Sequence, residues 1–275
     1  MTLMVIGKPI KHSLSPAIHN HWINKYNLNY KYLKKEVEES ELKSIIKNIK
    51  EQKIKGVNIT LPYKNKIFKL VDALSPYALA SNAVNTLYLK NHKVVGDNTD
   101  GKGFANSFKE DSGVDLKNKN IFLIGAGGAA QGILAELINQ KVNKVKILNR
   151  TKINAKRLIN KFANYKVNLS LEDWEKGNLD KDTHIVINTS SFGMKKSDLL
   201  NIDIGGLSQD VILYDIIYNP PETQLIKTFK KKGFRVFNGL GMLIHQAAIS
   251  FSLWFNIKLT SQDLCEARKL CEKKI

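Results

Sequence analysis

The sequence predicts an α/β protein with two domains, and three observations lead to this prediction. The middle of the chain alternates short apolar runs with longer amphipathic stretches, which is the pattern of parallel strands joined by crossover helices. The N-terminal part has strands and helices of its own. The C-terminal part has a helical pattern, and its most apolar stretch needs another surface to cover it.

The central segment, residues 102–239, is predicted to form a doubly wound domain. Residues 120–125, NIFLIG, make a continuous apolar run, as expected of a strand that is buried on both faces. The stretch AAQGILAELINQ follows and has apolar residues at helical spacing: Ile133, Leu134, Leu137 and Ile138. Further apolar runs come at 144–149, 184–189, 211–216 and 234–239.

The N-terminal part is expected to form a second α/β domain. Its strands are predicted at 3–7, 30–38, 56–62 and 83–98, the last with a turn around Asn91, and its helices at about 15–26 and 40–52. Near the C-terminus, MLIHQAAISFSLWF is apolar almost all round and predicts a buried helix. We therefore expect residues 240–275 to complete a domain formed by 1–101, with 102–239 as the other domain and a cleft between them.

Composition places the chain with ordinary soluble globular proteins. It has 275 residues, of which 43% are hydrophobic and 25% charged. The sequence contains no apolar stretch long enough to cross a membrane, and its N-terminus lacks the order of segments that marks a signal peptide. The cytoplasm is the expected compartment. Two cysteines, Cys265 and Cys271, are too few for a disulfide framework or a metal site, so no metal is expected.

A net charge of +18 raises the alternative of a nucleic-acid-binding protein. The 43 basic residues are, however, 39 lysines and only 4 arginines, and the lysines are spread along the whole chain. Specific readout of nucleic acid favours arginine and clustered charge. We expect weak, non-specific retention on DNA at most, a small molecule as the partner, and a monomer or homodimer.

A glycine-rich turn follows the strand IFLI and indicates a bound dinucleotide. The stretch GAGGAAQG matches G-x-G-x-x-A through Gly125, Gly127 and Ala130. The helix that follows would present free N–H groups and a positive dipole end to a pyrophosphate. A turn of this composition can also be only a turn. The strand before it and the helix after it favour a Rossmann-like cofactor site.

The end of the next strand distinguishes between cofactors. The stretch KVKILNRT ends about 25 residues after Gly125, where an NAD-binding domain usually places an acidic residue on the ribose. This chain has Asn149, Arg150 and Thr151 instead. A guanidinium can bind the 2′-phosphate of NADP through two hydrogen bonds, whereas an acid would repel it. The prediction is NADP, and the alternative is a surface arginine at a helix start.

Polar residues in the N-terminal part are candidates for binding a substrate. In KHSLSP, Ser13 and Ser15 would point the same way from an extended segment just before Pro16, and such a pair could bind a carboxylate. The alternative is a helix N-cap, which needs only one of them.

Two further candidates carry charge. NITLPYK places Thr60 and Lys64 at the end of an apolar strand, and AVNTL places Asn85 among apolar neighbours. GDNTDGKG places Asp100 in a glycine-flanked turn at the junction of the two domains. A lysine at a strand end and an acid at the hinge could both face a nicotinamide.

These motifs together resemble the shikimate dehydrogenase family. The matching stretches occur in the family's order and cover nearly the full length: GKPIKHSLSPAIHN, NITLPYK, AVNTL, GDNTDGKG, GAGGAA, NRT, NTSSFGM, DIIYNPPET and GLGMLIHQAAISF. The resemblance implies an N-terminal α/β substrate domain and a Rossmann-like NADP-binding domain. It also implies the reversible, NADPH-dependent reduction of 3-dehydroshikimate to shikimate, a step in making chorismate and the aromatic amino acids.

The resemblance also implies roles for individual residues. Lys64 matches the family's catalytic lysine and Asp100 its partner carboxylate. The substrate carboxylate would be bound by Ser13 and Ser15, and the ring hydroxyls by Thr60, Asn85, Asp100, Tyr218 and Gln246. The pyrophosphate would lie on Gly125, Ala126, Gly127, Gly128 and Ala129, and the 2′-phosphate on Asn149, Arg150 and Thr151. The residues near the ribose or nicotinamide would be Thr189, Ile216, Gly239 and Met242.

Hydride chemistry explains why a lysine is suited to this position. A hydride that arrives at a ketone carbon leaves negative charge on the oxygen, so the reaction needs a proton donor there and a base in the oxidative direction. Lys64 is the candidate for both.

Departures from the family pattern leave alternatives open. The family usually has Ile-Gly before AVNT, where this chain has Ser81 and Asn82, and asparagine is well tolerated at positive φ. Lys195 and Lys196 after Met194 could attract the NADP phosphates or only add solubility. The closest alternative function is a quinate/shikimate dehydrogenase that prefers NAD, and a catalytically silent homologue is another.

Overall fold

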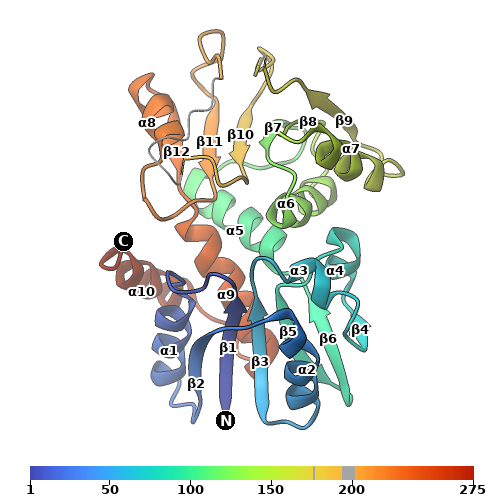
Figure 1. Ribbon diagram of the computed structural model, residues 1–275. Helices are drawn as coiled ribbons and strands as arrows, with labels where there is room; N and C mark the ends of the chain where they lie inside the picture. The colour runs from blue at the N-terminus through green and yellow to red at the C-terminus, as the bar shows by residue number, and fades with distance from the viewer. Residues whose placement is uncertain (176, 194–201) are drawn as a thin grey trace. The chain divides into compact units, whose positions relative to one another are not determined.

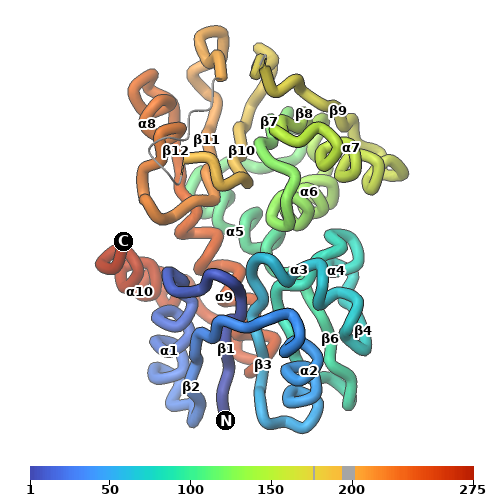
Figure 2. Tube along the Cα trace, in the orientation of Figure 1, coloured from blue at the N-terminus to red at the C-terminus, as the bar shows by residue number. Residues whose placement is uncertain are grey.

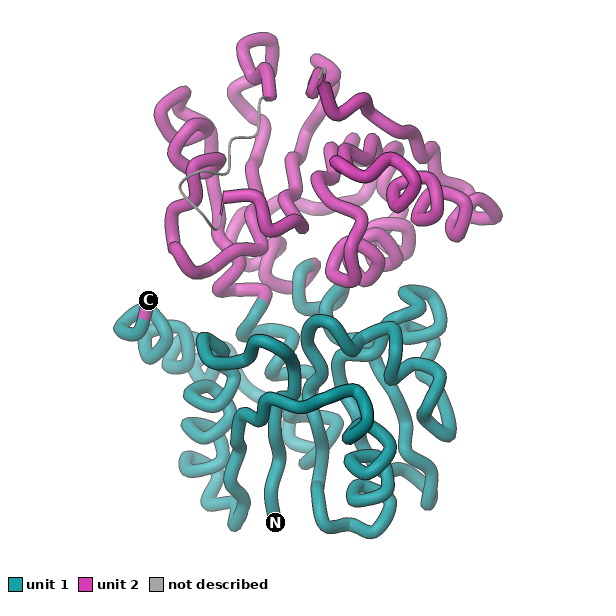
Figure 3. The backbone as a smooth tube through the Cα atoms, in the orientation of Figure 1, with its two compact units in different colours: residues 1–104, 243–274 teal, residues 105–242, 275 magenta. Residues whose placement is uncertain are grey.

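The computed structural model describes residues 1–175, 177–193 and 202–275. The chain divides into two compact units, shown in Figure 3. Unit 1 contains residues 1–104 and 243–274, and unit 2 contains residues 105–242 and 275.

Unit 1 is built on a mixed six-stranded sheet (Figure 1). In sheet order the strands are β2 (Lys31–Glu36), β1 (Thr2–Gly7), β3 (Ile54–Ile59), β5 (Thr86–Lys90), β6 (Lys93–Asp97) and β4 (Ala73–Leu74). β1 runs parallel to β2 and β3, whereas β5 pairs antiparallel with β3 and β6. The hairpin between β5 and β6 turns at Asn91 and His92, both at positive φ, so the predicted turn around Asn91 is confirmed.

Short helices and the C-terminal helices surround this sheet. They are α1 (Ser15–Lys25), the 3₁₀ helix η1 (Glu39–Glu41), α2 (Leu42–Lys50), α3 (Lys64–Ile67), α4 (Pro76–Ser81), α9 (Leu240–Phe255) and α10 (Ser261–Glu272). Figure 2 shows α1 and α10 side by side, and the Trp22 indole donates a hydrogen bond to the Asp263 carbonyl at 3.1 Å. Trp254 of α9 donates to the Leu87 carbonyl at 3.0 Å. The prediction that the C-terminal helices pack on the first domain is therefore confirmed.

Unit 2 contains a fully parallel six-stranded sheet. In sheet order its strands are β12 (Arg235–Phe237), β11 (Ile212–Asp215), β10 (Ile185–Asn188), β7 (Asn120–Ile124), β8 (Lys144–Leu148) and β9 (Asn168–Glu172). The helices that lie within unit 2 are α6 (Gly128–Asn139), α7 (Lys152–Lys161) and α8 (Gln224–Lys231). The helix α5 (Asp100–Ser112) begins in unit 1 and continues into unit 2. The strand order reverses between β7 and β10, which is the switch point where doubly wound proteins bind ligands. The predicted Rossmann-like topology is confirmed.

Asn82 ends α4 in a left-handed conformation, with φ of 52° and ψ of 33°. A left-handed residue is common at this place after a helix, and glycine or asparagine supplies it at the least cost. Asparagine in place of the family's usual glycine thus keeps the backbone geometry, as the sequence predicts.

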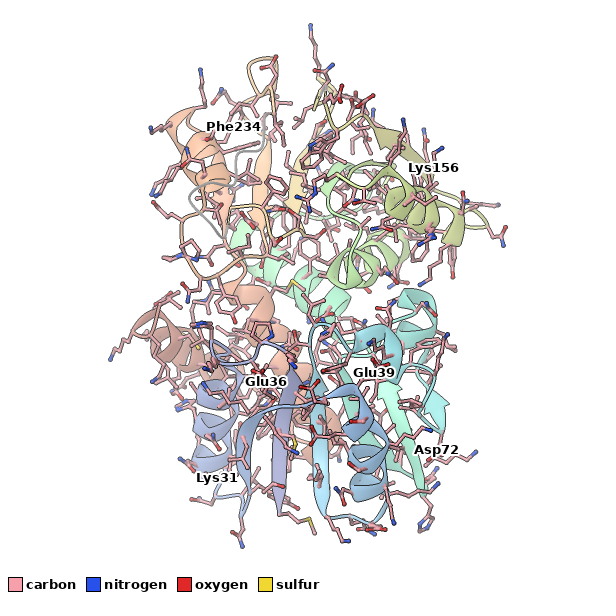
Figure 4. All side chains as sticks on the ribbon, viewed as in Figure 1. Lys31, Glu36, Glu39, Asp72, Lys156 and Phe234 are labelled. Atoms are coloured by element: carbon pink, nitrogen blue, oxygen red, sulfur yellow. The ribbon has the colours of Figure 1, made fainter. Side chains whose placement is uncertain are left out.

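Many basic side chains lie at exposed positions. Lys31 on β2 and Lys156 on α7, both labelled in Figure 4, are exposed. Two labelled acids take part in surface ion pairs: Glu39 pairs with Lys66, and Asp72 pairs with Lys50 at 3.4 Å. Within the described ranges, no helix is long and apolar enough to cross a membrane.

Candidate active site

Lys64 lies just beyond the carboxyl end of β3. The Thr60 N–H donates to the Ile6 carbonyl at 2.9 Å, which continues the pairing with β1 past the last residue of the strand. The chain then turns, and Lys64 begins the short helix α3. Its carbonyl accepts a hydrogen bond from the Val84 N–H at 2.9 Å, so the segments 58–64 and 83–86 are joined at this point.

Asp100 is the first residue of α5 and forms an ion pair with Lys64. The Lys64 Nζ lies 2.6 Å from the Asp100 Oδ2, and the two side chains are only 13% and 7% exposed. The prediction of a turn at Asp100 is wrong, because the residue begins a helix, where its negative charge meets the positive end of the helix dipole. The Asn98 side chain accepts a hydrogen bond from the Asp100 N–H at 3.0 Å and holds this start.

Asn85 holds the second oxygen of the same carboxylate. Its Nδ2 donates to the Asp100 Oδ1 at 2.8 Å, while Lys64 occupies the other oxygen. Each oxygen of the Asp100 carboxylate thus accepts a hydrogen bond, one from Lys64 and one from Asn85, and these bonds fix its orientation. Hydrogen bonds to a charged group are about twice as strong as neutral ones, so this arrangement fixes where the lysine ammonium points.

Gln246 approaches this cluster from α9. Its Oε1 lies 3.5 Å from the Asn85 Nδ2 and 3.4 Å from the Thr99 Oγ1. Gly103 makes the approach possible, because a Cβ at this position would lie 2.7 Å from the Cβ of Gln246. The structure therefore brings together four predicted site residues: Lys64, Asn85, Asp100 and Gln246.

Ser13 and Ser15 lie side by side at the start of α1. The Ser15 N–H donates to the Ser13 Oγ at 3.3 Å. The expected extended segment is wrong, because Leu14 between them has helical dihedral angles. Pro16 lies in the first turn, as predicted. Of the remaining predicted substrate residues, Thr60 lies against Gly7 at the end of β1, and Tyr218 belongs to unit 2, after β11.

The glycine-rich turn has the geometry that a pyrophosphate needs. Gly125 has φ of +105°, and a Cβ there would lie 2.7 Å from the Thr189 Oγ1, so only glycine fits. A Cβ on Gly127 would meet open space. Gly127 is the N-cap of α6 and provides no side chain, so no side-chain cap satisfies the N–H groups at the start of this helix.

The residues after β8 fit an additional phosphate. Asn149 donates from Nδ2 to the Thr151 carbonyl at 2.8 Å and fixes the turn, while Arg150 and Thr151 are exposed. A guanidinium and a hydroxyl are donors for a phosphate, and an acidic side chain at this turn would repel it.

The remaining predicted cofactor residues follow β11 and β12. Gly239 packs so closely on Ile216 that a Cβ would lie 1.8 Å from the Ile216 carbonyl oxygen. The Met242 N–H donates to the Tyr214 hydroxyl at 3.1 Å. Gly125, Arg150, Thr189, Ile216 and Gly239 therefore all follow the carboxyl ends of neighbouring parallel strands, where dinucleotides bind.

A buried acid connects two of these strand ends. The Asp215 carboxylate accepts hydrogen bonds from the Asn188 amide at 2.9 Å, the Ile217 N–H at 3.1 Å and the Thr223 hydroxyl at 2.7 Å. Burial raises the pKa of Asp215 to about 6, and these hydrogen bonds oppose the rise. The network holds the segment between β11 and α8, which carries Ile216 and Tyr218.

A group of buried polar side chains lies behind Asn85 and was not predicted from the sequence. They are Tyr32, Asn58, Thr86, Thr99 and Ser250, each at most 5% exposed. One signal was available in the sequence: Asn58 is a polar residue inside an apolar strand. Lys195 and Lys196, which are candidates for attracting phosphate, lie outside the described residues.

The fold and these sites define a class of protein: an oxidoreductase with a dinucleotide-binding α/β unit and a second α/β unit that carries a lysine–aspartate pair. Three family models match the chain. The shikimate dehydrogenase substrate binding domain matches residues 5–87, shikimate / quinate 5-dehydrogenase matches residues 107–199, and the shikimate 5′-dehydrogenase C-terminal domain matches residues 239–259. The chain belongs to the shikimate dehydrogenase family.

Individual relatives agree with this membership. Shikimate dehydrogenase (NADP(+)) of Pelagibacter ubique (strain HTCC1062) is 41% identical over 256 residues, which cover 93% of this chain and 94% of the relative. A structure of shikimate 5-dehydrogenase from Listeria monocytogenes in complex with shikimate and NAD has a TM-score of 0.88 and 31% identity, over 96% and 95% of the two chains. The ligand-free 5-ketofructose reductase of Gluconobacter sp. strain CHM43 also has a TM-score of 0.88, at 27% identity and 98% coverage of both chains.

Proposed function

We propose that this protein catalyses the reversible, NADPH-dependent reduction of 3-dehydroshikimate to shikimate, a step in making chorismate and the aromatic amino acids. The observation that carries the proposal is the buried ion pair between Lys64 and Asp100, held by Asn85 in a chain of this family. The substrate is a small molecule. The cytoplasm stays the expected compartment.

Lys64 is the acid and base of the proposed reaction. NADPH, when bound, supplies the hydride that adds to the ketone carbon. Lys64 gives its proton to the ketone oxygen as negative charge develops there, and takes the proton back from the hydroxyl in the oxidative direction. Asp100 is the acceptor that keeps the ammonium in place, because its carboxylate is itself fixed by Asn85.

The other side chains of unit 1, together with Tyr218, orient the substrate. Ser13 and Ser15, which a hydrogen bond from the Ser15 N–H to the Ser13 Oγ joins at the start of α1, are assigned to the substrate carboxylate. The ring hydroxyls are assigned to Thr60, Asn85, Asp100, Tyr218 and Gln246.

The residues that would hold NADP lie in unit 2. The pyrophosphate is assigned to Gly125, Ala126, Gly127, Gly128 and Ala129, because the space at Gly127 is open and the helix start is uncapped. Asn149, Arg150 and Thr151 are assigned to the 2′-phosphate. The ribose and nicotinamide are assigned to Thr189, Ile216, Gly239 and Met242.

A preference for NAD is the second candidate, because the Listeria monocytogenes relative was solved with shikimate and NAD. Arg150 argues against it in this chain. The test is the absorbance of reduced nicotinamide with purified protein, shikimate, and NADP or NAD in parallel. Quinate, offered with NADP or NAD, and 5-ketofructose, offered with NADPH or NADH, serve as control substrates. Turnover with shikimate and NADP supports the proposal, whereas turnover only with NAD, or only with a control substrate, contradicts it.

A further inference from the structure

The side-chain amide of Asn85 can have only one orientation. Its Nδ2 lies 2.8 Å from the Asp100 Oδ1 and 2.9 Å from the Thr99 Oγ1. A carboxylate in an ion pair only accepts hydrogen bonds, so the amide nitrogen must face Asp100. A flipped amide would place two acceptor oxygens against each other. The Oδ1 of Asn85 therefore points to the opposite side, where it needs donors.

The hydroxyl of Thr86 is one of these donors. Its Oγ1 lies 2.9 Å from the Asn85 Oδ1, and the Thr99 N–H donates to the same oxygen at 2.9 Å. A hydroxyl has one hydrogen, so Thr86 must accept in all its other hydrogen bonds. The Thr86 side chain is fully buried, so water does not compete for this position.

Two neighbours set the direction of the Thr86 hydroxyl. The Ser250 Oγ lies 2.8 Å from the Thr86 Oγ1, and the Asn58 Nδ2 lies 3.0 Å from it. The Asn58 Oδ1 accepts from the Tyr32 hydroxyl at 2.7 Å, so the Asn58 amide presents its nitrogen to Thr86. The nearest acceptors for the single Ser250 hydrogen are the Thr86 Oγ1 at 2.8 Å and the Gln246 carbonyl at 3.1 Å, and we assign it to the nearer one, Thr86. The Asn58 amide also donates to Thr86, so the hydrogen of Thr86 is left for Asn85.

We propose that Thr86 and Ser250 are positioning residues of the reaction. They act through Asn85, which orients the Asp100 carboxylate toward the Lys64 ammonium. The inference rests on the proposed function, in which this ion pair moves the proton. Because Ser250 lies on α9, this helix contributes to the geometry of a pair that lies at the starts of α3 and α5.

The test compares Thr86→Val, which keeps the shape of the side chain but lacks the hydroxyl, with Thr86→Ser, which keeps the hydroxyl. In shikimate oxidation, Thr86→Val should lower kcat by about tenfold, the size of one lost hydrogen bond. The dissociation constant for NADP should not change, and Thr86→Ser should restore kcat. Thr183→Val is the matched control, since Thr183 is a buried threonine of unit 2.

Melting temperatures separate positioning from stability. If kcat follows the melting temperature across the three variants, and not the presence of the Thr86 hydroxyl, the proposal is overturned. Ser250→Ala should lower kcat less than Thr86→Val, and the double variant should be no slower than Thr86→Val, because both changes act on one hydrogen bond. If the reductions of kcat in the two single variants multiply in the double variant, the inference is contradicted.

Two further outcomes keep the test decisive. If Thr86→Val does not fold, an unchanged kcat in folded Ser250→Ala overturns the proposal by itself. An inactive wild-type protein would refute the proposed function, and the positioning role with it. Wild-type turnover with an unaffected Thr86→Val would overturn the positioning role alone.

Discussion

The Lys64 ammonium and the Asp100 carboxylate lie 36 residues apart in the sequence and 2.6 Å apart in space, and both are nearly excluded from water. Surface ion pairs contribute little to stability because solvent screens them. A pair at this depth is different, since the loss of either partner leaves an unpaired charge behind. The position of Lys64 therefore differs from that of the lysines whose ion pairs lie on the surface, such as Lys66 with Glu39.

Replacement of Lys64 by alanine should lower kcat by about two to four orders of magnitude, the usual contribution of a positioned acid or base. NADP should bind as before, because the cofactor residues lie in unit 2. Steady-state kinetics and a fluorescence titration of NADP would measure both quantities. The control is Lys66→Ala, which removes a lysine of the same helix that pairs with exposed Glu39. Weaker shikimate binding with kcat intact would refute the acid/base role.

Arg150→Asp should weaken NADP binding far more than NAD binding. The guanidinium is exposed after β8, where it can bind the 2′-phosphate, and an acid would repel that group. The loss for NADP should be at least tenfold, given about 1.5 to 3 kcal/mol for a hydrogen bond to a charged group. Arg157→Asp, the same charge change at an exposed position of α7, is the control. Equal losses for both nucleotides would argue against the assignment.

A methyl group at Gly127 should interfere with the cofactor and not with folding. The backbone there has φ of −85°, which alanine adopts freely, and the added Cβ would meet open space. Gly127→Ala should therefore raise the dissociation constant for NADP at an unchanged melting temperature. Gly239→Ala is the contrasting case, since its Cβ would lie 1.8 Å from a carbonyl oxygen and should lower the melting temperature. If Gly127→Ala binds NADP with unchanged affinity, the assignment of the pyrophosphate to this turn is wrong.

His19 should make unit 1 sensitive to acid. Its ring is fully buried and stacks on Tyr32 at 4.2 Å, and burial lowers the pKa of His19 to about 3 from 6.5. A depressed pKa gives stability that is present above pH 6.5 and is lost as pH falls toward 3, because the unfolded chain binds the proton first. Between pH 7 and pH 5 the loss is about 2 kcal/mol.

The variant His19→Phe keeps an aromatic ring against Tyr32 and should flatten the pH dependence of the unfolding free energy, measured with denaturant. The exposed residue His12 provides the control, because His12→Gln should leave the dependence as it is in the wild type. If the unfolding free energy of His19→Phe depends on pH as it does in the wild type, groups other than His19 cause the acid sensitivity.

Asp215 should make unit 2 less stable as pH rises, which is the opposite of the effect of His19 on unit 1. Its raised pKa of about 6 means that the folded form holds a proton that the unfolded chain has already released. Stability is therefore full below about pH 4 and is lost as pH rises through 6, by about 3 kcal/mol. Asp215→Asn should remove this dependence, measured as the pH profile of unfolding free energy from pH 4 to 7. The same profile in the variant and the wild type would contradict the assignment.

Much of the fold was predictable because the signals are local. The buried parallel strands of unit 2 are continuous apolar runs, and the turn at Asn91 separates two runs that pair as β5 and β6. The missed elements lack such a signal. β9 has no fully buried residue, and β4 and α3 are only two and four residues long.

The contact between Lys64 and Asp100 was predictable from the sequence, whereas the buried polar side chains behind Asn85 were not. The resemblance identified Lys64 and Asp100, but glycines around Asp100 suggested a turn, whereas Gly103 is small because α5 packs against Gln246 of α9. Thr86 and Ser250 are 164 residues apart. Only the paired strands and the packed helix bring their hydroxyls together, so no local pattern could have indicated this contact.

The interrupted course of unit 1 has a consequence for biosynthesis on the ribosome. The stretch 105–242 of unit 2 is contiguous and is synthesised before residues 243–274, which contain most of α9 and all of α10. Unit 1 lacks until then the partners of Trp22 and Leu87, which are Asp263 and Trp254. During synthesis, unit 2 can therefore fold before unit 1. The sheet of unit 1 lacks the packing of α9 until residues 243–274 have been made.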